Sequence, residues 1–126
     1  IKVEVSISKY LPLIKVDAER ILQVLRNLIG NAVKFTPNSG YVRISASPVT
    51  KGVQVSIADT GVGIPKEKLT TIFNKFQQEA LTSSNKIMGT GLGLSIVNNI
   101  IKAHGGKIWV ESVLGRGSIF TFVLPA

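Results

Sequence analysis

The chain has 126 residues, 44% of them hydrophobic, which is the size of one globular domain with a single core. It has no cysteine, no signal-peptide pattern and no apolar run approaching the ~20 residues of a membrane span, which excludes disulfides and thiolate metal sites and is compatible with a reducing compartment. Its 15 Lys and Arg against 7 Asp and Glu give a net charge of +8, but these residues are spread singly, so nucleic-acid binding is not expected.

The N-terminal third is predicted to contain a strand and a long helix. Apolar and polar residues alternate over residues 1–8, which indicates a half-buried strand. Asp17 is the expected N-cap of a helix over residues 18–35, and Thr36-Pro37 ends that helix. The apolar residues expected to form its buried stripe are Ile21, Leu22, Leu25, Leu28, Ile29, Ala32 and Val33.

The middle of the chain is predicted to form two strands, a short helix and a long loop. Alternation over residues 41–47 and 53–57 predicts strands on either side of a turn. The second strand runs into Asp59-Thr60-Gly61-Val62-Gly63-Ile64-Pro65, and Pro65 suits the start of a helix through residue 73. Residues 77–88 lack periodicity, and loops of this length usually carry function.

The C-terminal third contains a glycine motif, a helix and two strands. Gly89-Thr90-Gly91-Leu92-Gly93-Leu94 leads into a helix predicted over residues 94–104, which Gly105-Gly106 ends. Residues 107–113 and 118–124 predict two strands joined by a turn. About five strands and three helices in this order predict an α+β two-layer sandwich.

The glycine motif is a candidate phosphate site. Alternate glycines allow close backbone approach, and the adjoining helix N-terminus offers unpaired N–H groups and a positive dipole end. The alternative is a flexible loop at a glycine-tolerant helix start. The spacing differs from the dinucleotide fingerprint and from the P-loop, and the protein-kinase motifs are absent.

Polar residues also share one face of the first long helix. Gln23, Asn27 and Asn31 follow at intervals of four, with Lys34 three residues further. Amide oxygens can coordinate Mg²⁺, and a lysine adds positive charge for a phosphate. The alternative is a solvated polar face, although such faces are normally filled with Glu, Lys and Arg.

Asp59 ends a predicted strand before a double-glycine turn. A carboxylate accepts hydrogen bonds, so it can hold the exocyclic amine of adenine and would repel the carbonyl of guanine, while Gly61 and Gly63 let a base approach closely. One alternative is an Asp that only starts a turn. Another is the Asp-Thr-Gly triplet of a dimeric aspartic protease, although those enzymes are all-β.

Four motifs in this order resemble one family. They are Asn27-x-x-x-Asn31-Ala32-x-Lys34-Phe35, Asp59-x-Gly61-x-Gly63-Ile64, Phe73-x-x-Phe76 and Gly89-x-Gly91-x-Gly93-Leu94. Together they resemble the catalytic, ATP-binding domain of sensor histidine kinases, in the GHKL (Bergerat-fold) superfamily with DNA gyrase and heat-shock chaperone ATPases. The resemblance covers residues 16–125. It implies a mixed, mainly antiparallel sheet with the three helices on one face, and ATP bound between helices and a lid.

The resemblance also implies roles for particular residues. Asn31 would bind Mg²⁺ with help from Asn27, Asp59 would bind adenine N6, and residues 77–88 would be the lid. Thr121 would support the adenine contact through its hydroxyl. The ATP-binding residues implied are Asn27, Asn31, Lys34, Phe35, Asp59, Gly61, Gly63, Ile64, Phe76, Lys86, Gly89, Thr90, Gly91, Leu92, Gly93, Leu94 and Thr121.

The departures from the family pattern are informative. Relatives that hydrolyse ATP carry a Glu where this chain has Asn27, an amide that cannot act as a base, which favours phosphoryl transfer. His104, the only histidine, precedes a glycine rather than an acidic residue, so we expect it to cap or pack a helix end. Between Phe73 and Phe76 this chain has Asn74-Lys75, where the resemblance leads us to expect an acidic residue and a proline.

The resulting hypothesis is the ATP·Mg²⁺-binding domain of a two-component sensor histidine kinase. The whole chain, residues 1–126, would be one domain of a longer protein and would transfer the γ-phosphate of ATP to a histidine on a separate dimerisation domain. A response-regulator receiver would be the downstream partner, with no nucleic-acid or membrane contact by this cytoplasmic domain. A nucleotide-binding but catalytically silent module is the main alternative.

Overall fold

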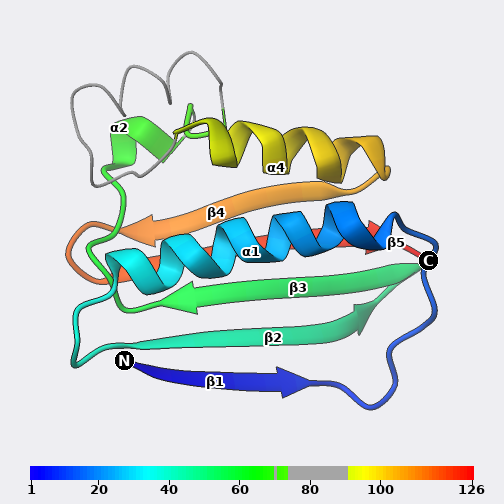
Figure 1. The fold of residues 1–126 in the computed structure, drawn as a ribbon, viewed down its shortest axis with the longest axis horizontal. Coiled ribbons are helices and arrows are strands. Elements are labelled where there is room, and N and C mark those ends of the chain that lie inside the picture. The colour runs from blue at the N-terminus through cyan, green and yellow to red at the C-terminus, as the bar shows by residue number, and fades with distance from the viewer. Residues whose placement is uncertain (70, 74–90) are drawn as a thin grey trace.

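The computed structural model describes residues 1–69, 71–73 and 91–126, with only the helical backbone of residues 91 and 92 (Figure 1). Its elements in chain order are β1 (Lys2–Ile7), α1 (Ala18–Phe35), β2 (Tyr41–Val49), β3 (Gly52–Asp59), α2 (Lys66–Leu69), α4 (Gly91–Ala103), β4 (Lys107–Val113) and β5 (Gly117–Pro125). The helices described in this part of the chain include none long and apolar enough to cross a membrane.

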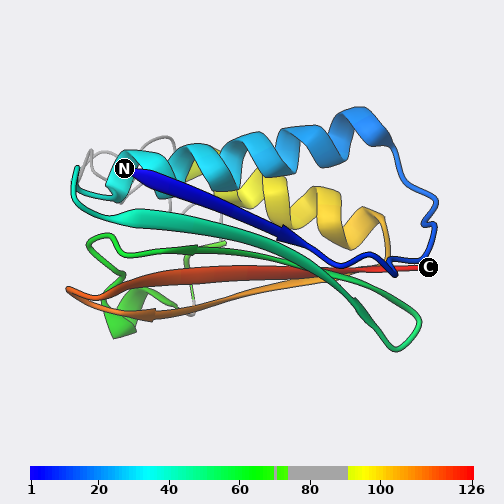
Figure 2. The same cartoon turned by 90° about the horizontal axis from the view of Figure 1, so that it is seen from below.

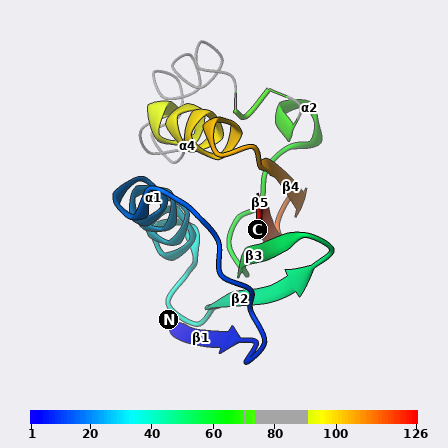
Figure 3. The same ribbon diagram turned by 90° about the vertical axis from the view of Figure 1, so that its right-hand side faces the viewer.

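The strands form one mixed sheet in the order β1-β2-β3-β5-β4. β1 runs parallel to β2, and the other neighbouring pairs are antiparallel. α1 and α4 pack together over one face of the sheet (Figure 2). The single turn of α2 contacts β4 and lies apart from that pair (Figure 3). The predicted α+β architecture with a mixed, mainly antiparallel sheet is confirmed.

The core lies between the sheet and the two long helices. Val24, Leu28 and Ala32 follow at intervals of four, so they form the buried line of α1. The other fully buried side chains include Val97 and Ile101 of α4 and Val42, Ile57, Phe122 and Leu124 of the sheet. The predicted stripe was therefore misplaced at its margins: Leu22 and Val33 are 47% and 38% exposed, and Val24 was omitted.

β1 is an exposed edge strand, and the prediction of a half-buried strand was wrong. Val3, Val5 and Ile7 lie in register with residues of β2 whose side chains face the helices. They are nevertheless 51–62% exposed, because α1 packs over β3, two strands away. Alternation in the sequence identified a strand here, but not whether another element covers it.

The ends of the two long helices agree in part with the sequence. The Arg20 N–H donates to Asp17 Oδ1 at 3.3 Å, which confirms Asp17 as the N-cap of α1. α4 begins at Gly91, three residues before its predicted start, so its first turn takes in two of the motif's glycines. Its end is as predicted: Gly105 has φ +77°, and its N–H donates to Lys102 O at 2.9 Å.

His104 joins the end of α4 to the start of α1. Its Nε2 accepts the backbone N–H of Asp17 at 3.1 Å, and its Nδ1 lies 2.8 Å from Ile100 O. An acceptor at Nε2 leaves Nδ1 as the donor, so the ring is the neutral tautomer in this arrangement. The predicted packing role of His104 is confirmed.

Candidate functional site

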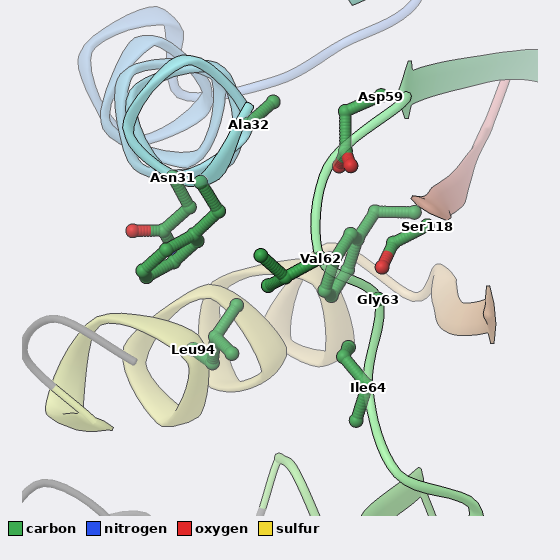
Figure 4. Close-up of a pocket in the computed structure, with 10 residues that line it drawn as sticks. Asn31, Ala32, Asp59, Val62, Gly63, Ile64, Leu94 and Ser118 are labelled. Atoms are coloured by element: carbon green, nitrogen blue, oxygen red, sulfur yellow. The ribbon is translucent and has the colours of Figure 1, made fainter. Parts of the chain in front are cut away.

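A pocket opens between the C-terminal half of α1, the loop after β3, α4 and the start of β5 (Figure 4). Part of it is open to solvent. Its lining residues are Asn31, Ala32, Phe35, Asp59, Val62, Gly63, Ile64, Leu94, Ser118 and Phe120. Three of the four sequence motifs therefore meet at one place.

Asp59 supplies the carboxylate of this pocket. It is the last residue of β3, and its Oδ1 accepts the Gly61 N–H at 2.9 Å. The Ser118 N–H also hydrogen-bonds to it. Burial raises the pKa of the Asp59 carboxyl above its ordinary value, while the Gly61 and Ser118 N–H groups act in the opposite direction. These two N–H groups hold the side chain in place. The carboxylate lines the cavity and can accept further hydrogen bonds there.

The walls around Asp59 are apolar. Ala32, Ile64, Leu94 and Phe120 are buried in the protein, and their side chains line the cavity. Phe120 is in turn held edge-on by Phe73, with ring centroids 6.1 Å apart. The chemistry of this lining suits a flat apolar ring with one hydrogen-bond donor at its edge, because the single carboxylate would fix its orientation.

The two glycines of the loop are required by close packing. Gly63 has φ +75°, and a Cβ there would collide with Val113 O. A Cβ at Gly61 would lie 2.5 Å from Phe35 O and 2.9 Å from Asp59 Oδ1. These glycines therefore bring the loop against α1 on one side and against the β4–β5 turn on the other.

The polar face of α1 reaches the pocket only at its C-terminal end. Asn31 and Phe35 line the cavity, whereas Asn27, one turn earlier, does not. Lys34 is exposed, with its Nζ 5.8 Å from the centroid of the Phe35 ring. Gln23 accepts a hydrogen bond from Arg20 at 3.1 Å, away from the cavity.

Thr121, predicted to support the adenine contact, does not line the pocket. Its Oγ1 lies 3.2 Å from Ser56 Oγ, on the face of the sheet opposite the helices. The hydroxyl residue that lines the pocket is Ser118, three positions earlier on β5, which sequence reasoning missed. A small hydroxyl residue directly after Gly117 at the predicted strand start was the available signal.

Several predicted residues lie outside the described part of the chain. These are Phe76, Lys86, Gly89 and Thr90, together with the predicted lid over residues 77–88; of Gly91 and Leu92 only the helical backbone is described. Gly93 lies in the first turn of α4, and Leu94 lines the pocket.

The described residues offer limited ligands for a metal ion. Among them, no three His, Cys, Asp or Glu side chains gather into a metal-binding group. The Asn31 amide is a neutral oxygen ligand that lines the cavity. One amide oxygen fits Mg²⁺ bound together with a nucleotide, because this ion usually takes most ligands from water and phosphate.

Comparisons with known proteins agree with this geometry. Residues 16–126 match the family described as histidine kinase-, DNA gyrase B-, and HSP90-like ATPases. The adaptive-response sensory kinase SasA of Synechococcus elongatus (strain ATCC 33912 / PCC 7942 / FACHB-805) is 46% identical over 116 residues, which are 91% of this chain and 30% of SasA. The sensor histidine kinase WalK of Bacillus subtilis (strain 168) is 39% identical over 114 residues, 89% of this chain and 19% of WalK.

Solved structures show the same fold. The nucleotide-free catalytic domain of histidine kinase ThkA superposes with a TM-score of 0.83 at 36% identity, covering 98% of this chain and 78% of that one. Full-length ShkA in complex with AMPPNP gives 0.81 at 38% identity, covering 98% and 25%. The chain thus spans less than a third of the length of the curated relatives described above. By sequence and by fold, the chain belongs to the family of histidine kinase-, DNA gyrase B-, and HSP90-like ATPases.

Proposed function

We propose that this domain binds ATP with its adenine in the cavity beside Asp59. The observation that carries the proposal is a partly buried carboxylate, fixed by two backbone N–H groups, facing an apolar cavity. The Asp59 carboxylate would accept the N6 amine of adenine and disfavour the carbonyl oxygen that guanine has at that position. ShkA, which shares the fold, is solved with the ATP analogue AMPPNP, and this supports the assignment.

The phosphates and Mg²⁺ would lie along α1 toward the start of α4. Asn31 would supply an amide oxygen to the ion, with Asn27 one turn away on the same helix face. Bound Mg²⁺ would neutralise phosphate charge, and Lys34 would add positive charge at the solvent side. The helix N-terminus at Gly91 offers backbone N–H groups for phosphate oxygens.

The reaction we propose is transfer of the γ-phosphate to a histidine on a separate dimerisation domain of the parent protein. Asn27 lies one helical turn before Asn31 on the same face. Its amide cannot take a proton from water, so hydrolysis of ATP is disfavoured. His104 is engaged with Asp17 and Ile100 and is therefore unsuited as the acceptor. The domain would contribute orientation and charge neutralisation to the transfer.

The parent protein would act in a two-component pathway, with a response-regulator receiver as the downstream partner and this domain in the cytoplasm. Structural neighbours include histidine kinase ThkA in complex with the response regulator TrrA. The net charge of +8 would favour association with an acidic receiver, and added salt would then weaken that association.

The test is phosphoryl transfer in a reconstituted system. The purified chain is mixed with the histidine-bearing domain of its parent protein, Mg²⁺ and γ-labelled ATP. We expect acid-labile label on the histidine domain, and none when that histidine is replaced or Mg²⁺ is chelated. ATP binding without any transfer would instead identify a silent nucleotide-binding module, and the absence of binding would contradict the proposal as a whole.

A further inference from the structure

Hydrogen bonds join the end of β4 and the β4–β5 turn to the loop after β3, which lines the pocket. The turn itself does not line the pocket. The Ile64 N–H donates to Ser112 Oγ at 2.8 Å, and the Gly115 N–H donates to Val62 O at 2.7 Å. Gly63 lies between these two bonds in the sequence. A side chain at this position would collide with the backbone of Val113 and Leu114. The loop thus has no freedom to move away from the turn without losing both hydrogen bonds.

Ser112 is the centre of this contact. Its O–H donates to Gly117 O at 2.8 Å, and its Oγ lies 2.8 Å from Ser118 Oγ. Since its single proton is used toward Gly117, Ser118 must donate, and the oxygen of Ser112 accepts from both Ser118 and Ile64. All three hydrogen-bonding positions of this hydroxyl are therefore occupied by groups of the site.

The bonds of Ser112 lead to two residues that line the cavity. Ile64 is a wall of the pocket, and Ser118 both lines it and hydrogen-bonds through its backbone N–H to the Asp59 carboxylate. Ser112 itself is half-buried and does not line the cavity. It is thus placed to set the distance between the carboxylate and the wall without touching a bound ligand.

We propose that Ser112 is a positioning residue for adenine recognition. Through Ser118 and Ile64 it holds the Asp59 carboxylate and the Ile64 wall at the separation that a purine with a 6-amino group needs. This inference rests on the proposed binding of ATP. It adds that specificity for the 6-amino group depends on a hydroxyl outside the pocket.

The experiment measures a coupling between Ser112 and the 6-amino group. Affinities for ATP and for purine riboside triphosphate, which lacks that amine, are compared by calorimetry for the natural chain and for Ser112→Ala. We expect Ser112→Ala to weaken ATP binding about tenfold, the size associated with losing hydrogen bonds that hold a charged group. The analogue should lose only about two- to threefold, since it makes no bond to Asp59.

The matched control is Ser56→Ala. Ser56 also pairs its hydroxyl with a hydroxyl of β5, that of Thr121, but on the face of the sheet away from the cavity. We expect Ser56→Ala to bind both nucleotides as the natural chain does. Ser112→Thr, which retains a hydroxyl on the strand, should restore most of the discrimination between ATP and the analogue.

The outcomes separate this inference from the function on which it rests. If the natural chain binds no ATP, the proposed function fails with it. If the natural chain prefers ATP to the analogue, but Ser112→Ala keeps that preference or weakens both ligands equally, only the positioning role is wrong. Should Ser112→Ala not fold, Ser112→Cys fills the same space with a weaker hydrogen-bonding group, and the same comparison decides.

Discussion

Both faces of the sheet carry hydroxyl residues of β5, but only one face contributes such a residue to the pocket. On the helix-covered face, β5 places Ser118 and Phe120 in the pocket beside Asp59. On the opposite face, the same strand pairs Thr121 with Ser56. Since successive residues of a strand point to opposite faces, a shift of one position decides whether a hydroxyl serves the site.

The first prediction concerns burial, where the largest effect is expected. Ile57 on the covered face is fully buried, so Ile57→Ala should lower the free energy of unfolding by about 2–5 kcal/mol. Val5, on the uncovered edge strand, is 61% exposed, and Val5→Ala should change it by less than about 0.5 kcal/mol. Urea denaturation of both variants makes the comparison, and equal losses would contradict the assignment of β1 as an exposed edge.

The second prediction separates binding from stability at Asp59. Asp59→Asn should weaken ATP binding about a hundredfold, because an amide NH₂ can replace the acceptor that the adenine amine needs. The domain should stay at least as stable at neutral pH. Burial raises the pKa of Asp59 in the folded state, so its ionisation costs stability as pH rises, and the neutral amide removes that cost. Calorimetric titration and thermal unfolding of the same sample test both parts.

The third prediction compares the two hydroxyls of β5 directly. Ser118→Ala should weaken ATP binding about fivefold, because it removes the bond to Ser112 beside the carboxylate. Thr121→Val, which removes a hydroxyl on the opposite face, should leave ATP affinity unchanged. If Thr121→Val weakens ATP binding as much as Ser118→Ala does, the claim that only the Ser118 hydroxyl contributes to ATP binding is wrong.

The fourth prediction follows from the raised pKa of Asp59. As pH falls through that pKa, the carboxylate takes up a proton and loses acceptor strength, so ATP affinity should fall at a higher pH than an ordinary aspartate would give. The phosphates of ATP titrate as well, and the pH dependence of binding to Asp59→Asn measures their contribution. An identical pH profile in the natural chain and in Asp59→Asn would show that Asp59 does not contact the base.

Local patterns predicted most of the fold, and the errors have physical causes. Asp17, Thr36 and Gly105 define helix ends through hydrogen bonds within a few residues, so the sequence alone locates them. Whether Val5 or Leu22 is covered depends on where α1 lies over the sheet, which is a tertiary property. The start of α4 was placed three residues late, because glycines that favour a loop are tolerated in a helix turn here.

Part of the candidate site was predictable from the sequence. Asn31, Asp59 and Gly63 stand in motifs that the family resemblance assigns to one site, and all three line the pocket. Ser112 and Ser118 are joined by a hydrogen bond across the β4–β5 turn, and sequence periodicity does not predict such a bond. Thr121 was chosen by resemblance alone, and the alternation of the strand places it on the other face. The aspartic-protease alternative is wrong, since the chain has the α+β fold and the family described above.

The central claim is that Asp59 makes this cavity a site for adenine. Calorimetric titration of the purified chain with ATP and with GTP, each in Mg²⁺, tests it most directly. We predict that ATP binds and that GTP binds at least about tenfold more weakly, because the carboxylate faces the guanine carbonyl instead of an amine. Equal affinity for the two nucleotides, or binding of neither, would contradict the account.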